Sequence, residues 1–162
     1  MRKRASAERV AFNFLALKKK NVWEHPLFGG LKWDPSLRRW RGAVKVGPIG
    51  KVRFFLEGKE KKPEEFDTQK AEKIYNKFLS GERKLKMMAA LENIDLYNSE
   101  WKEETGPGLS PKELADRWAL TDLIVREGGS GSLWYDVGGA FTDHGIEIRF
   151  GPGGRYGGSY IS

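Results

Sequence analysis

Leu133-Trp134-Tyr135-Asp136-Val137 and, after a glycine turn, His144-Gly145-Ile146-Glu147-Ile148-Arg149-Phe150 decide the fold of this chain. Both stretches place large apolar side chains at every second position, which is the period of a β-strand. The sequence therefore predicts a hairpin with residues 138–143 as its loop. The register that turns the apolar sets toward one core pairs Leu133 with Ile148, Tyr135 with Ile146, Val137 with His144, Trp134 with Glu147 and Ser132 with Arg149.

His144, one of only two histidines in the chain, is the main catalytic candidate in this hairpin. Asp143 is its neighbour, but successive strand residues point to opposite faces, so the two make a poor acid/base pair. We interpret His144 as a partly buried structural histidine, because it shares a strand face with two isoleucines. The alternative is a hydrolase-type enzyme in which His144 acts as a general base together with Asp136, Asp143 or Glu147.

A second hairpin is predicted from residues 38–46 and 49–57, with Gly47-Pro48 at its turn. Val44 lies opposite Val52, Gly42 opposite Phe54 and Trp40 opposite Leu56 in the best register. The reverse face then collects cationic side chains around one aromatic ring, namely Arg39, Arg41, Lys45, Lys51, Arg53 and Phe55. Lys45 faces Lys51 directly, and like charges across a strand pair weaken a sheet. This face is therefore the candidate partner-binding site, and an ordinary solvated face is the alternative.

The centre of the chain is predicted to be helical. Apolar residues recur at helical spacing over residues 71–79 and again over 82–101, with Ser80-Gly81 as a stop between them. Ser110-Pro111-Lys112-Glu113 has the pattern of a capping box and predicts a short helix ending near Trp118. Further strands are expected at 27–33, 120–127 and 155–161. The predicted class is α+β, with antiparallel strands from the N- and C-terminal parts packed against two central helices.

Composition limits the chemistry that this chain can perform. Its 162 residues include no cysteine and only two histidines, so disulfides and thiolate metal sites are excluded, and no cofactor or metal ion is indicated. No apolar run has the length of a membrane span. A basic N-terminal arm, residues 1–22, with the pattern of a short helix, precedes a single domain of residues 23–162.

The positive charge is unevenly distributed along the sequence. Residues 1–62 contain 17 basic and 5 acidic residues, a net charge of +12, whereas the remaining chain has 12 and 17, a net charge of −5. The N-terminal part is therefore the part suited to an acidic partner.

Several motifs resemble a bacterial family of uncharacterised proteins over residues 26–162. They are Phe28-Gly29 with Leu31 and Trp40, Leu96-Tyr97-Asn98 with Trp101, the short capped helix, and Trp134-Tyr135-Asp136 followed by Phe141, His144 and Ile146. Members of the family carry Trp-Gly before the histidine, where this chain has Thr142-Asp143. The resemblance implies a small α+β protein, and similar proteins are often immunity partners of bacterial toxins.

Three function classes follow from these observations. The leading interpretation is a non-enzymatic protein-binding module, most concretely a cytoplasmic immunity-type inhibitor that meets an acidic protein surface with the basic face. The second is a nucleic-acid-binding protein that uses the basic arm and the same face, and it predicts affinity that falls steeply with salt. The third is the enzyme based on His144.

Overall fold

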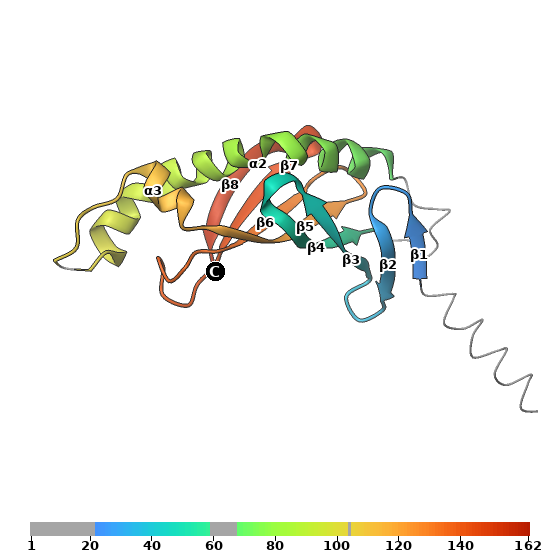
Figure 1. The fold of residues 1–162 in the computed structure, drawn as a ribbon, viewed down its shortest axis with the longest axis horizontal. Coiled ribbons are helices and arrows are strands. Elements are labelled where there is room, and N and C mark those ends of the chain that lie inside the picture. The colour runs from blue at the N-terminus through green and yellow to red at the C-terminus, as the bar shows by residue number, and fades with distance from the viewer. Residues whose placement is uncertain (1–21, 59–67, 104) are drawn as a thin grey trace, which may run out of the picture.

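The computed structural model describes residues 22–58, 68–103 and 105–162, which form one sheet with a long helix across it (Figure 1). Its strands are β1 (Val22–His25), β2 (Gly29–Asp34), β3 (Arg39–Val46), β4 (Gly50–Glu57), β5 (Ala119–Arg126), β6 (Gly131–Asp136), β7 (Ile146–Gly151) and β8 (Arg155–Ile161). Its helical elements are η1 (Gly47–Ile49), α2 (Gln69–Leu96), η3 (Tyr97–Trp101, a π-helical turn), α3 (Pro111–Asp116) and η4 (Pro152–Gly154). The predicted basic arm lies outside the described residues except for Val22, which begins β1.

The strands from both ends of the sequence join into this one sheet. They lie in it in chain order, and every neighbouring pair is antiparallel except β4 and β5, which are parallel. A parallel pair requires a crossover connection, and α2 and α3 provide it here. The sequence left open whether the two sets of strands pair with each other, and the β4–β5 ladder is where they do.

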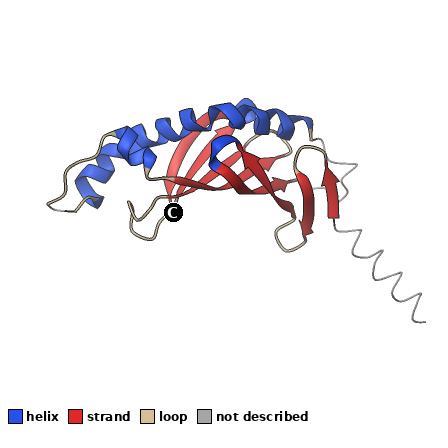
Figure 2. Ribbon diagram, in the orientation of Figure 1, coloured by secondary structure: helices blue, strands red, loops and turns tan. Residues whose placement is uncertain are grey.

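The helix α2 covers one face of the sheet, and the hydrophobic core fills the space between them (Figure 2). Its buried residues recur at helical spacing, as in Ile74, Phe78 and Leu85. The largest fully buried side chains come mainly from the strands and the loops that follow them, and include Trp40, Tyr135, Phe28, Phe54, Phe141 and Leu133. The α+β class is therefore confirmed, with a mostly antiparallel sheet as its main layer.

The prediction of two central helices was wrong in one respect. A single helix runs through Ser80 and Gly81 without interruption. Phe78 and Glu82 are buried on either side of this pair, so packing against the sheet continues through it. Tertiary burial thus outweighs the weak local stop signal of one serine and one glycine. The second helix of the structure is the short α3, whose capping box at Ser110 and Glu113 is present as predicted.

Both predicted hairpins have the expected registers. Leu133 pairs with Ile148 and Tyr135 with Ile146, and in the other hairpin Val44 pairs with Val52. The predicted pairing of Val137 with His144 was wrong, because the ladder ends at Tyr135 and Ile146. Residues 137–145 form the loop, which is longer at both ends than the sequence predicted. Strand β1 was not predicted, since its four residues carry no repeated alternation.

Candidate functional site

The sheet face turned away from α2, here called the free face, holds the basic residues singled out from the sequence. Alternation along β4 buries Phe54 under α2 and places its neighbours Arg53 and Phe55 on the free face. The described helix α2 lies on the opposite side of the sheet, as Figure 2 shows. The functional question is therefore how the charges on this face are arranged.

Four of the six predicted partner-binding residues line one open hollow of about 520 Å³, here called the arginine hollow. These four are Arg39, Arg41, Arg53 and Phe55, and the β2–β3 hairpin supplies the remaining wall, including Lys32, Asp34 and Leu37. The other two, Lys45 and Lys51, are exposed and paired directly across β3 and β4, as predicted. Neither lysine forms an ion pair with another described residue.

Arg39 and Phe55, which both line the arginine hollow, contact each other. The guanidinium carbon of Arg39 lies 3.9 Å from the centre of the Phe55 ring, a cation–π contact. The same guanidinium is 3.5 Å from Glu57, whose other carboxylate oxygen is 3.3 Å from Arg126. One face of the Phe55 ring is therefore already covered by a guanidinium of the same chain.

Arg53 is held in place by a carboxylate from the neighbouring parallel strand. Its Nε and terminal nitrogen contact the two oxygens of Asp122 at 2.5 and 2.7 Å. Asp122 is buried and also accepts a hydrogen bond from Thr121, whereas the Arg53 side chain is 68% exposed. Arg41 is 60% exposed and lies 3.9 Å from Asp34. Both arginine side chains are therefore largely exposed. Asp122 holds Arg53 in place, and Asp34 lies near Arg41.

Three of the four candidate catalytic residues line one hollow on the free face. His144 and Asp136 line a shallow hollow of about 430 Å³ together with Asp122, Asp143 and Arg53. His144 is 48% exposed in the β6–β7 loop and lies 3.9 Å from Asp143. The prediction that His144 is a partly buried strand residue was thus wrong, because the strand begins two residues later. The rings of His144 and Trp101 make an edge-to-face contact.

Glu147, the remaining candidate catalytic residue, is held by hydrogen bonds from two neighbouring side chains. It is buried on the free face, where it accepts hydrogen bonds from Ser132 at 2.7 Å and from Arg149 at 2.9 and 3.0 Å. Burial would raise the pKa of Glu147, but these hydrogen bonds and the charge of Arg149 outweigh it and leave that pKa below its ordinary value. A carboxylate in this state is a poor general acid.

The structural histidine is His25, which the sequence analysis did not single out. It is 8% exposed, and its Nδ1 accepts hydrogen bonds from the backbone N–H groups of Leu27 and Phe28 at 3.1 and 3.2 Å. Its Nε2 lies 3.2 Å from Glu72 on α2, and its ring stacks on Phe28. His25 therefore fastens the β1–β2 turn to the start of the helix, a role that no local sequence signal reveals.

The fold and the free face define an α+β protein with an eight-stranded, mostly antiparallel sheet that carries ordered charges on the side turned away from α2. Residues 25–154 match the family described as "Uncharacterized protein conserved in bacteria (DUF2262)", and the chain belongs to that family. No curated protein and no solved structure matches the chain. Among the described residues, no helix combines the length and apolarity of a membrane span, and no group of three or more potential ligands is placed to hold a metal ion.

Proposed function

We propose that this protein is a non-enzymatic binding module that holds an acidic segment of another protein in the arginine hollow. The observation that carries the proposal is the convergence of Arg39, Arg41 and Arg53 around Phe55 in an open hollow on the free face. The immunity-type inhibitor expected from the sequence is the most specific form of this proposal.

The existing ion pairs prepare these arginines for a carboxylate ligand. A guanidinium has five N–H donors in one plane, and Asp122 occupies two nitrogens of Arg53, so outward-facing donors of Arg53 stay available. Because the side chain is already ordered, a partner carboxylate that binds it loses less conformational entropy. Arg41 is less constrained, since its nearest carboxylate oxygen is 3.9 Å away. It is therefore free to complete a bidentate contact with the partner.

The same carboxylates disfavour the nucleic-acid alternative. Asp34 lines the hollow, and Asp122 and Glu57 lie among the arginines on the free face. A continuous phosphate backbone would pass these negative charges at close range, whereas an acidic protein segment can place single carboxylates between them. Charge spacing therefore favours a protein partner over a nucleic acid.

A pull-down from a lysate of the source cell tests the proposal with four baits. The first three are the wild type, the double variant Arg41→Glu/Arg53→Glu and a control, Lys70→Glu/Lys84→Glu, that makes the same charge change on exposed positions of α2. Arg53→Glu sets a carboxylate beside buried Asp122, so Arg41→Glu/Lys51→Glu is tested as well, because it keeps the Arg53–Asp122 pair.

We expect a protein that the wild type and the control retain, that both free-face variants lose, and that nuclease does not release. Loss after nuclease treatment would replace the proposal with nucleic-acid binding. Equal capture by all baits, or no capture by any, would remove the arginine hollow as the binding site.

A further inference from the structure

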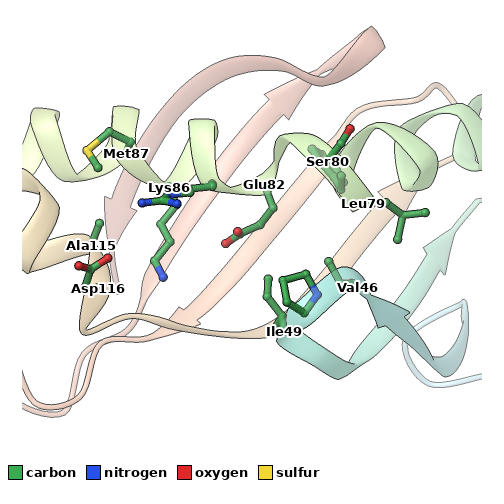
Figure 3. A pocket seen from close by; sticks show the side chains of 12 residues that line it. Val46, Ile49, Leu79, Ser80, Glu82, Lys86, Met87, Ala115 and Asp116 are labelled. Carbon is green, nitrogen blue, oxygen red and sulfur yellow. The ribbon is translucent and has the colours of Figure 1, made fainter.

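A second hollow lies on the helix side of the sheet, apart from the arginine hollow. It has a volume of about 330 Å³ and opens between α2, η1 and the end of α3 (Figure 3). Its walls are partly polar and partly apolar, and the apolar part includes Val46, Pro48, Ile49, Phe78, Leu79 and Met87. This volume is at the lower end of the range for small-molecule sites, about 300–1,000 Å³.

Of the charged residues that line this hollow, Glu82 is the buried one. Figure 3 shows Glu82 and Lys86 extending from α2 toward the space above Ile49. Glu82 is 9% exposed, and one of its oxygens accepts a hydrogen bond of 2.5 Å from the Tyr135 hydroxyl. Burial, followed by the charge of Glu82 and this hydrogen bond, raises the pKa of Tyr135 well above its ordinary value. Tyr135 therefore stays a neutral donor and does not cancel the negative charge.

Lys86, one turn further along α2, is engaged with a backbone oxygen rather than with Glu82. Lys86 has the i+4 spacing that commonly forms an ion pair on a helix, but its ammonium donates to the backbone oxygen of Trp118 at 2.6 Å. The pKa of Asp116 is lowered mainly by a hydrogen bond from Lys112, with smaller contributions from the charges of Arg83 and Lys86. Within the described part of the chain, Glu82 has no ion-pair partner.

We propose that this hollow binds a small primary amine with an apolar body, whose ammonium group pairs with the carboxylate of Glu82. A buried charge is costly unless an opposite charge or several hydrogen bonds compensate it, and Glu82 has one hydrogen bond from a neutral donor. The apolar part of the walls suits a short alkyl or aromatic body. Arg83, Lys86 and Asp116 line the hollow as well. Because Asp116 is already paired with Lys112, the two cations repel a second positive charge on the ligand, and monoamines are favoured over diamines.

Butylamine is a suitable probe, with 1-butanol as the neutral analogue of the same length and cadaverine as the diamine. Binding is followed by two-dimensional ¹H–¹⁵N NMR of the full chain in phosphate buffer, which contains no competing amine. The variant Glu82→Gln keeps the shape of the side chain and an acceptor for Tyr135 but removes the charge. We expect butylamine to shift signals around Ser80 and Ala115, both of which line the hollow, and to bind Glu82→Gln roughly ten- to a hundredfold more weakly.

A second variant, Ile49→Trp, fills the hollow from the exposed turn and leaves Glu82 itself unsubstituted, and it is the test if Glu82→Gln does not fold. It should abolish the butylamine shifts while the rest of the spectrum is preserved. Equal shifts with 1-butanol, tighter binding of cadaverine than of butylamine, or unchanged butylamine affinity in either folded variant would overturn the proposal.

Discussion

Replacing Gly81 by alanine tests whether α2 is one continuous helix. Gly81 has no positive φ, and a Cβ added there would meet no atom within 4 Å, so alanine fits without strain. Alanine is favoured over glycine inside a helix by about 1 kcal/mol. For a domain of this size, that increase in the free energy of unfolding raises Tm by about 2–4 °C. Urea and thermal denaturation followed by circular dichroism at 222 nm measure both quantities.

Gly81→Pro separates the continuous helix from the two helices expected from the sequence. In a helix interior, proline removes a backbone hydrogen bond and clashes with the preceding turn, at a cost of about 3 kcal/mol or more. If Gly81 instead preceded a second helix starting at residue 82, proline there would be tolerated. We therefore expect opposite effects from Gly81→Ala and Gly81→Pro. A small or stabilising effect of proline, or a destabilising effect of alanine, would refute the continuous helix.

Gly131→Ala is the matched control for adding a methyl group. A Cβ at Gly131 would lie 1.9 Å from the backbone oxygen of Ile124 and 2.5 Å from the Phe150 ring. Neither the ladder nor the buried ring can move aside freely, so we expect a loss of about 3 kcal/mol or more. The same substitution is thus expected to stabilise the protein at Gly81, where there is space for a methyl group, and to destabilise it at Gly131, where there is none.

Three further predictions concern buried or hydrogen-bonded ionisable groups. His25→Ala leaves the N–H groups of Leu27 and Phe28 without their acceptor and should lower the free energy of unfolding in urea by about 2 kcal/mol; a change below about 0.5 kcal/mol would contradict the fastening role. Hydrogen bonds from Tyr156 and Ser159 lower the pKa of Glu92, so the contribution of this carboxylate to stability is present above pH 4.5 and is lost as the pH falls. Glu92→Gln should therefore flatten the acid side of the stability–pH curve, and an unchanged slope would rule this out. Burial and the bond to Glu92 raise the pKa of Tyr156 to about 12, so its contribution is present below pH 10 and is lost between pH 10 and about 12; Tyr156→Phe should remove that alkaline loss.

The two hairpins were predictable because their information is local. A period of two fixes which residues share a face, and facing apolar sets fix the register, as the pairs Leu133–Ile148 and Val44–Val52 confirm. The capping box at Ser110 is local for the same reason. The point where the loop ends and β7 begins was harder to predict. The alternation of side chains continues past Ile146, the residue at which the β6–β7 ladder ends.

The remaining features depend on contacts between distant parts of the sequence. The parallel pairing of β4 with β5 brings Asp122 to Arg53, which is 69 residues away in the sequence. That contact gives Arg53 an ion-pair partner that the alternation of the strand does not reveal. The continuity of α2 through Gly81 likewise follows from burial against the sheet, which outweighs the local preference. Sequence alone therefore located the basic residues of the free face but not their partners.

The alternation of β6 separates the two proposed sites. Tyr135 points under α2, where its hydroxyl donates to Glu82, whereas its neighbour Trp134 lines the hollow beside Arg53 on the free face. Because the sheet lies between these side chains, a substitution at Glu82 leaves the charges of the free face unchanged. A substitution at Arg41 likewise leaves the amine site intact. Effects at sites without shared contacts are additive to a good approximation, so the failure of one proposal would leave the other standing.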